Sequence, residues 1–290
     1  MLNVVPGNGR VFRPTSKCVT SSVPVTLPSL SNSCLTLANG TISLRDCTIS
    51  GNAAAGGGGG AALLAGGSLT NCTISGNTAI GAGGGLAALG GPVTLHHCTI
   101  AFNNAAGGGG IALSGGSAAP SACIVSNNTA GSGPDVLGAL LSGGHNLIGD
   151  AAGASGLTGT DLAGADAALE PLADNGGPTR THALGAGSAA IDAAAPGACD
   201  PDRDQRGIER PTDGNGDGDA ACDIGAFEAD AGAPPCPADF NQDGGVDGAD
   251  VDAFFLAWES GDPSADVNAD GGIDGGDVDT FFSAWEAGGC

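Results

Sequence analysis

One pattern occurs three times in succession, as LRDCTISGNAAAGGGGGAALLAGGS (residues 44–68), LTNCTISGNTAIGAGGGLAALGGPVT (69–94) and LHHCTIAFNNAAGGGGIALSGGSAAP (95–120). A fourth copy begins with SACIVSNNTAG at residue 121. Self-similarity with a period of about 25 residues is typical of solenoids, in which each unit stacks on its neighbours. A flexible glycine-rich linker would not keep Cys-x-Ile-x-x-Asn in phase, so the sequence predicts stacked coils.

The segment Cys-Thr-Ile carries the main strand signal in each copy, because successive side chains of a strand alternate between two faces. Cys and Ile are expected to point inward and to form ladders on coils that lie about 4.8 Å apart. The ladder cysteines are Cys47, Cys72, Cys98 and Cys123. An Asn follows each of them by five residues and is expected to satisfy backbone groups at a turn: Asn52, Asn77, Asn103 and Asn128. Apolar islands at 61–64 and 86–89 predict a second strand per coil.

Five segments are expected from these patterns and from the shifts in composition. Residues 1–43 form an N-terminal cap or irregular segment, 44–172 the parallel β-helix repeats, and 173–230 a region that closes the solenoid. Residues 231–235 form a linker before a calcium-binding module at 236–290. We expect a monomer.

The acidic charge of the chain is concentrated near its C-terminus. The net charge is −23, and residues 236–290 hold thirteen acidic side chains without a single Lys or Arg. Residues 1–198 hold only eight acidic side chains. An acidic segment of this kind favours cation binding, and the lack of a basic patch argues against nucleic acid as a partner. No apolar run is long enough for a transmembrane segment.

The ten cysteines fall into two groups. The four ladder cysteines are expected to stay buried thiols, because buried Cys behaves as a small hydrophobe. The other six form three candidate local pairs, Cys18–Cys34, Cys199–Cys222 and Cys236–Cys290, and such disulfides would indicate an oxidising, extracytoplasmic setting. The first residues, MLNVVPGNGR, show no signal-peptide pattern, so an extracellular or cell-surface location is inferred from the modules alone.

Two calcium ions are expected in two loops of the C-terminal module. Each loop places side-chain oxygens at positions 1, 3, 5, 9 and 12, glycine at position 6, and a backbone carbonyl ligand at position 7. The first set of ligands is Asp239, Asn241, Asp243, Gly245, Asp247 and Asp250. The second set follows 27 residues later as Asp266, Asn268, Asp270, Gly272, Asp274 and Asp277. A third segment, 213–219, begins with the same spacing but has Ile224 at position 12, which makes it a much weaker candidate.

A helix with an apolar stripe is predicted after each of the two loops. The stripes repeat at i, i+3, i+4 and i+7 and are expected to pack against each other. They consist of Val251, Phe254, Phe255 and Trp258 in the first helix and Val278, Phe281, Phe282 and Trp285 in the second. Asp252 and Asp279 flank these stripes and are expected to be solvated. Prolines at 234, 235 and 237 exclude a regular helix before the first loop.

Duplicated loop–helix units with Asp at position 12 and no complete EF-hand resemble a type I dockerin. The resemblance implies calcium-dependent folding and docking onto a cohesin-like or other surface protein. The hydroxyl pair that the family carries late in each loop is replaced here by residues 248–249 and 275–276, Gly-Ala and Gly-Gly, which puts the receptor-reading residues in doubt.

The segment between the repeats and the module carries GGHNLIGD (143–150), LEPLADNGGPTRTHAL (169–184), GSAAID (187–192), DQRGIERP (204–211) and CDIGAFE (222–228). In this order the motifs resemble the choice-of-anchor Q proteins, over about residues 40–228. The resemblance implies a right-handed parallel β-helix on a secreted or surface-displayed bacterial protein, without catalytic residues to carry over. The expected fold is therefore an all-β right-handed parallel β-helix, a solenoid, followed by a small α-helical dockerin or EF-hand-like module.

No catalytic residues are predicted. Residues 44–128 offer only Arg45, Asp46, His96 and His97 as charged or titratable side chains besides their cysteines, too few for paired carboxylates with a base. The two histidines are interpreted as a solvated turn, with a metal pair as the alternative. A polar group in the closing segment is interpreted as an ion-pair network: Arg180, His182, Asp192, Asp204, Arg206, Asp223 and Glu228.

Two functions remain open at this point. The first is a structural, adhesive or glycan-binding β-helix protein, with a polysaccharide as a candidate ligand. The second is a polysaccharide-degrading enzyme, a pectin-lyase-like lyase or hydrolase recruited by its dockerin. Three or more ionisable residues that converge on the long face of the β-helix would favour the enzyme.

Overall fold

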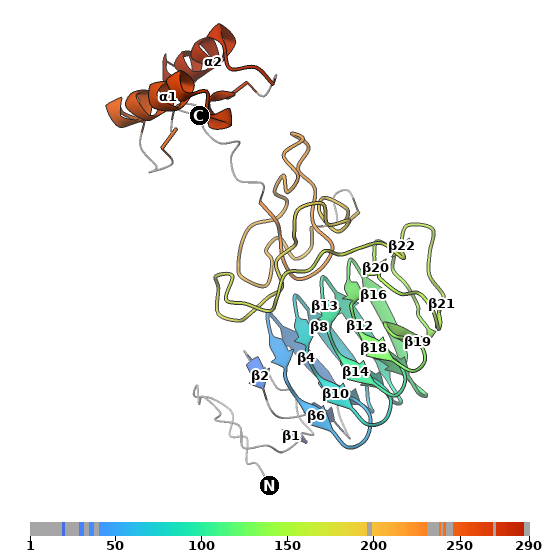
Figure 1. Ribbon diagram of the computed structural model, residues 1–290. Helices are drawn as coiled ribbons and strands as arrows, with labels where there is room; N and C mark the ends of the chain where they lie inside the picture. The colour runs from blue at the N-terminus through green and yellow to red at the C-terminus, as the bar shows by residue number, and fades with distance from the viewer. Residues whose placement is uncertain are drawn as a thin grey trace. The chain divides into compact units, whose positions relative to one another are not determined.

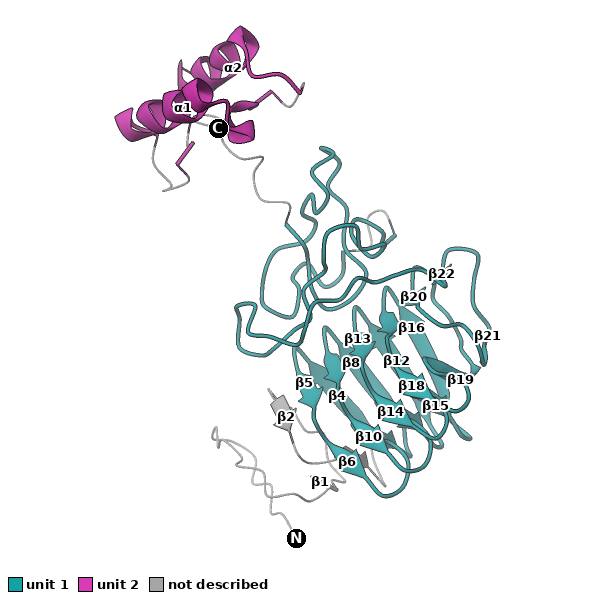
Figure 2. Cartoon of the chain, viewed as in Figure 1, with its two compact units in different colours: residues 1–230 teal, residues 231–290 magenta. Residues whose placement is uncertain are grey.

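The computed structural model describes residues 19–20, 29–31, 35–37, 41–195, 199–230, 238, 240–241, 246–268 and 271–286. The chain divides into two compact units, residues 1–230 and residues 231–290 (Figure 2). The first unit is a parallel β-solenoid and the second contains two short helices. The predicted fold class is confirmed in this form.

Four parallel sheets, here named A to D, run along the solenoid (Figure 1). Sheet A consists of β1 (Val19–Thr20), β3 (Leu35–Leu37), β7 (Ala61–Leu63), β11 (Leu86–Ala88), β15 (Ile111–Leu113), β19 (Val136–Ala139) and β21 (Ala154–Ser155). Sheet B consists of β2 (Ser29–Ser31), β5 (Thr48–Ser50), β9 (Thr73–Ser75), β13 (Thr99–Ala101), β17 (Ile124–Ser126), β20 (Leu147–Ile148) and β22 (Leu162–Ala163). Sheets C and D are shorter.

Sheet C consists of β4 (Ile42–Arg45), β8 (Gly67–Thr70), β12 (Pro92–His96) and β16 (Ser117–Ser121). Sheet D consists of β6 (Ala53–Ala54), β10 (Thr78–Ala79), β14 (Asn104–Ala105) and β18 (Thr129–Ala130). Each coil therefore crosses the sheets in the order C, B, D and A. The register matches the sequence repeat, because Thr48 pairs with Thr73, Thr73 with Thr99, and Thr99 with Ile124.

The inward cysteine ladder is confirmed. The four cysteines form no disulfide, are at most 2% exposed, and belong to one core cluster with Ile49, Ile74, Ile100 and Val125 of sheet B. The backbone N–H group of Cys98 lies 3.4 Å from the Sγ atom of Cys123 in the next coil. Burial raises the pKa of Cys72 and of Cys98 well above the ordinary value, which keeps both as thiols.

The asparagine ladder is also confirmed, and it has a direction. The Nδ2 atom of Asn52 donates to Oδ1 of Asn77 at 2.8 Å, and Asn77 donates to Asn103 at 2.9 Å. Asn103 donates to Asn128 at 2.9 Å, and Asn128 donates to Oδ1 of Asp135 at 2.8 Å. A carboxylate, which only accepts, thus ends the chain of amides.

Strands begin before the expected boundary at residue 44. β2 pairs with β5 and β3 pairs with β7, so residues 29–31 and 35–37 already extend the two sheets. This stretch lacks the Cys-x-Ile-x-x-Asn pattern, which is why the repeat could not reveal it. Strands continue to β22, within the predicted β-helix segment.

The second unit consists of α1 (Gly248–Ser260), a short 3-10 helix η1 (Pro263–Ala265) and α2 (Gly275–Glu286). The predicted apolar stripes pack together, and the rings of Phe254 and Phe281 are stacked. α1 begins with a capping box between Asp247 and Asp250 and ends at Gly261, whose φ of 68° is the left-handed conformation that glycine adopts freely.

Candidate functional site

The second predicted calcium loop is described from residue 266 to 268 and from 271 onward. The Oδ2 atom of Asp266, at position 1, accepts a hydrogen bond of 3.0 Å from the N–H group of Gly271, at position 6. Gly271 has a φ of 87°, which explains the need for glycine at the sharp turn. The carboxylate at position 1 therefore holds the turn at position 6 of the same loop.

The carboxylates at position 12 make the same contacts in both loops. Asp277 accepts hydrogen bonds from the backbone N–H groups of Asn268 (3.2 Å) and Asp274 (2.9 Å), at positions 3 and 9. In the first loop, Asp250 accepts from Asn241 (3.0 Å) and Asp247 (2.9 Å), again at positions 3 and 9. The sequence duplication is thus a structural duplication as well.

These hydrogen bonds favour ionised carboxylates. The bond from the Asp247 N–H group lowers the pKa of Asp250, and the bond from the Asp274 N–H group lowers the pKa of Asp277. Both side chains are fully covered, 0% exposed, at the start of their helices. Ionised, oxygen-only donors of this kind suit a hard cation such as calcium.

The remaining predicted ligands are placed only in part. Gly272 lies within the described part of the second loop, whereas Asp239, Asp243, Gly245 and Asp270 lie outside the described residues. Among the described residues, no three His, Cys, Asp or Glu side chains converge as a metal site would require. The set of calcium ligands therefore stays a prediction. No described helix has the length and apolar character needed to cross a membrane.

The weaker candidate loop at residues 213–219 shares this arrangement. Oδ2 of Asp213, at position 1, accepts from the N–H group of Gly218, at position 6, at 2.8 Å. Asp192 accepts from Asn215 (3.1 Å) and Ala221 (3.3 Å), which occupy positions 3 and 9. The contacts made by position 12 in the other loops are thus made here by a carboxylate from a remote segment, which sequence spacing alone could not reveal.

The closing region, residues 173–230, lies against the outer face of sheet B (Figure 1). The amide of Gln205 donates to the hydroxyl of Thr48 at 2.9 Å and accepts from the hydroxyl of Thr73 at 2.7 Å. The hydroxyl of Thr99 accepts from the N–H group of Ala226 at 3.0 Å. The outward threonines of three coils are therefore buried under this region, and this part of the long face is closed.

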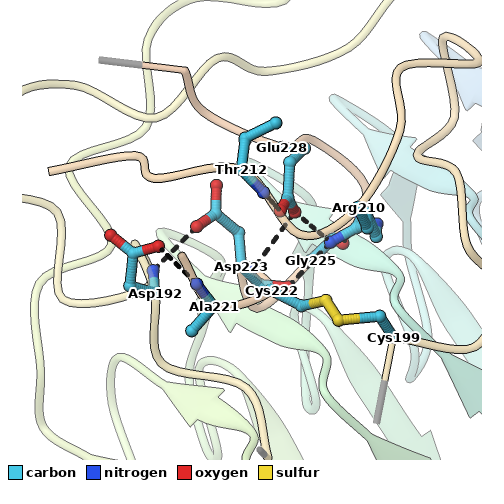
Figure 3. The surroundings of a disulfide bond; sticks show 9 residues. All are labelled: Asp192, Cys199, Arg210, Thr212, Ala221, Cys222, Asp223, Gly225 and Glu228. Carbon is cyan, nitrogen blue, oxygen red and sulfur yellow. Dashed lines mark hydrogen bonds and ion pairs between the residues drawn. A yellow bond between two sulfur atoms is a disulfide. The ribbon is translucent and has the colours of Figure 1, made fainter. Parts of the chain in front are cut away.

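Two largely buried ion pairs lie within the closing region, and Figure 3 shows the one between Arg210 and Glu228. Arg210 and Glu228 are 2.6 Å apart with fully buried side chains, and Arg206 lies 2.7 Å from Asp204. Asp223 accepts hydrogen bonds from the N–H groups of Asp192 (2.7 Å) and Ala229 without a cation in direct contact. Burial and the nearby charge of Glu228 raise the pKa of Asp223 to about 7.

The predicted ion-pair network is confirmed in part. Asp204, Arg206, Asp223 and Glu228 belong to it. Arg180 is exposed, however, and His182 instead contacts Glu170 O and the hydroxyl of Ser75. The partner of Glu228 is Arg210, which sequence reasoning passed over although it lies in the quoted motif DQRGIERP. The disulfide Cys199–Cys222 is confirmed and lies beside this cluster (Figure 3).

The interpretation of His96 and His97 as a solvated turn is wrong for His97. His97 is 0% exposed, and its ring stacks on that of the half-buried His96, with centroids 4.9 Å apart. Asn71, one coil earlier at the same corner, donates to the carbonyl of Arg203. The closing region therefore reaches the corner that the sequence placed in solvent. The candidate pairs Cys18–Cys34 and Cys236–Cys290 lie outside the described residues.

Comparison with known proteins gives one match. Residues 15–150 match the family model described as the right handed beta helix region. No curated protein and no solved structure gives a significant match. Together with the parallel coils, this match supports a place for the solenoid among right-handed β-helix proteins, a fold common in surface and glycan-related proteins.

Proposed function

We propose that this protein acts outside the cell or on its surface, as a structural, adhesive or glycan-binding β-helix attached to a partner through a calcium-dependent, dockerin-like module. The observation that carries the attachment role is the duplicated loop. In both loops the carboxylate at position 12 accepts from the backbone at positions 3 and 9, and a helix follows. Two equivalent loop–helix units with one shared apolar core suit calcium-dependent folding.

The charge of the module supports the same proposal. Each loop carries five predicted side-chain ligands, four of them Asp, in a segment that has no Lys or Arg. Two calcium ions would supply four positive charges against this repulsion. The side chains proposed to hold them are the ten Asp and Asn ligands of the two loops, with the carbonyls of Gly245 and Gly272.

The closing region supports a scaffold more than an enzyme. Residues of the motifs DQRGIERP and CDIGAFE tie the region together and onto the coils: Gln205 binds two outward threonines, and Arg210 holds Glu228. Among the region's ionisable side chains, Arg206 is paired with Asp204, Arg210 is paired with Glu228, and Asp223 accepts from backbone N–H groups. These motifs are the ones that resemble choice-of-anchor Q proteins, whose attachment devices vary, and a dockerin-like module fits that description.

Calcium titration of the full chain tests the proposal. Trp258 and Trp285 are the only tryptophans and both lie in the module, so EGTA should shift their emission toward that of exposed indole. The far-UV signal of the solenoid should persist. Asp239→Ala with Asp266→Ala should mimic EGTA, whereas Asp252→Ala with Asp279→Ala, on the exposed sides of the helices, should not.

The docking role is tested separately with immobilised type I cohesin domains. The full chain should be retained in calcium and released by EGTA. Tryptophan emission that ignores EGTA and both ligand substitutions would contradict the calcium module. A calcium response without retention on any cohesin would leave the module but contradict the proposed receptor class.

A further inference from the structure

A cavity of about 330 Å³ lies at one corner of the solenoid, near its C-terminal end. It is lined by the end of β17, by residues that follow β17, β20 and β22 of sheet B, and by the two residues before β19 of sheet A. The polar groups that matter are Ser126, Asp135, Gly149, Asp150 and Asp166. Ligand pockets in proteins begin at about 300 Å³, so this cavity suits one small molecule.

Ser126 is the first indication that the cavity holds a ligand. It is only 3% exposed, and its hydroxyl lines the cavity without a hydrogen bond to any described residue. Two coils earlier, at the equivalent position in sheet B, the hydroxyl of Ser75 is paired with Nε2 of His182 at 2.8 Å. The hydroxyl itself borders the open space of the cavity, so the group at Ser126 is available to whatever enters it.

Gly149 keeps this hydroxyl accessible. A Cβ atom at that position would lie 2.5 Å from Oγ of Ser126 and 3.1 Å from Oδ2 of Asp135. Both oxygens therefore face the same small space above the glycine. A ligand hydroxyl in that space can accept from Ser126 and donate to Asp135, which needs a group that does both.

Asp135 is held in place for such a contact. Its Oδ1 atom accepts the last bond of the asparagine ladder, and its Oδ2 atom accepts from the N–H group of Asp150 at 2.6 Å. The carboxylate is 1% exposed. Oδ2 still has a free lone pair on the side of Gly149, since a carboxylate oxygen accepts two hydrogen bonds.

The charge of the lining selects the class of ligand. Asp135, Asp150 and Asp166 contribute three carboxylates, and no Lys, Arg or His lines the cavity. Anionic ligands such as uronates are therefore repelled. A metal ion is not favoured either, because no three acidic side chains of the described residues converge to hold one. Pro134 and Ala165 add apolar wall, against which the C–H face of a sugar ring can lie.

We propose that this corner cavity binds one residue of a neutral saccharide, with Ser126 and Asp135 bonding one hydroxyl of the sugar and Gly149 providing the space. The inference rests on the glycan-binding form of the proposed function and names its site. It does not depend on the calcium module, because every lining residue belongs to the solenoid unit.

The test uses the full chain in calcium buffer. An array of neutral oligosaccharides (glucans, xylans, mannans and galactans) is probed beside uronate-containing ones, and the best neutral ligand is then titrated by calorimetry. Ser126→Ala should weaken binding about tenfold, the effect of one hydrogen bond. Gly149→Ala should abolish it, because its Cβ atom occupies the space of the sugar hydroxyl.

Two control variants match these substitutions. Ser68→Ala removes a hydroxyl that bonds Ser43 on the exposed outer face, and Gly159→Ala adds a Cβ atom where nothing lies within 4 Å. Both should bind like the parent. If Gly149→Ala unfolds, as judged by far-UV circular dichroism, Ser126→Ala decides alone, because it removes one atom without adding any.

Three outcomes overturn the site: no neutral sugar is retained at millimolar concentration, uronates bind better than neutral sugars, or Ser126→Ala and Gly149→Ala bind like the parent. Repeating the titration in EGTA separates the two proposals. Saccharide binding that survives EGTA while tryptophan emission shifts supports both. If tryptophan emission responds to calcium and EGTA but no saccharide binds, only the saccharide site is contradicted.

Discussion

The ring of Phe254 stacks on the ring of Phe281, with centroids 4.4 Å apart and planes 8° apart. The two residues hold equivalent positions on α1 and α2, and both are 0% exposed. The centre of the second unit is therefore made by one residue from each loop–helix repeat. Neither repeat can bury its aromatic stripe without the other.

The first prediction follows from this pair. Phe254→Ala should destabilise the module by about 3–5 kcal/mol, the usual effect of truncating a buried aromatic residue. The measurement is tryptophan emission, which in Phe254→Ala should no longer shift when calcium is added. Leu256→Ala, on the same helix but 72% exposed, is the control and should change little. Equal effects of the two variants would mean that the helices do not pack through the predicted stripes.

The predictable part of the fold is the periodic part. Cys98 and Asn103 could be placed from sequence because each recurs at the same position in four coils, and stacking turns a repeat into a ladder. The contact between Gln205 and Thr48 could not, because it joins residues 157 positions apart and occurs once. Asp192 was expected in the ion-pair network, but its contacts with the backbone of Asn215 and Ala221 could not be predicted, because they depend on the tertiary path and not on spacing.

The second prediction concerns the cysteines. Peptide mapping of nonreduced protein should show Cys199 bridged to Cys222 and the four ladder cysteines free. It should also show Cys236 bridged to Cys290, which remains a sequence-based expectation. Cys199→Ser with Cys222→Ser should lower the stability of the solenoid unit by about 3 kcal/mol, as expected for a closed loop of this size. A free Cys236 or crosslinked ladder cysteines would contradict the assignment.

The third prediction concerns the asparagine ladder. Asn103→Ala removes the acceptor for both donors of Asn77 and the donor to Asn128, and leaves the carbonyl groups of Ile74 and Ala101 without that partner. Buried polar groups without partners are unfavourable by about 1–3 kcal/mol each, so unfolding should become easier by at least about 3 kcal/mol. Denaturant unfolding measures this. Asn104→Ala, at the adjacent exposed position, should lie within about 0.5 kcal/mol of the parent.

The last prediction concerns pH. Asp223 lies in a cluster with Asp204, Glu228, Arg206 and Arg210, and burial of its carboxyl, followed by the nearby charge of Glu228, raises the pKa of Asp223 to about 7. In the unfolded chain the same carboxyl titrates near pH 3.8. Between these values the folded state binds the extra proton, so this group stabilises the fold at low pH and loses that contribution as pH rises toward 7.

The thermal midpoint of the parent should therefore rise relative to Asp223→Asn as the pH is lowered from 8 to 5, because the variant lacks the titrating group. The slope can reach about 1.4 kcal/mol per pH unit within this window. Taking the difference between the two proteins removes the contribution of His182, whose pKa is lowered by burial and which acts in the opposite direction. Asp202→Asn, at an exposed position, should track the parent at every pH. If the difference in thermal midpoint between the parent and Asp223→Asn stays constant from pH 8 to 5, Asp223 is ionised in the folded state throughout this range. Arg210 would then compensate the charges of both Asp223 and Glu228.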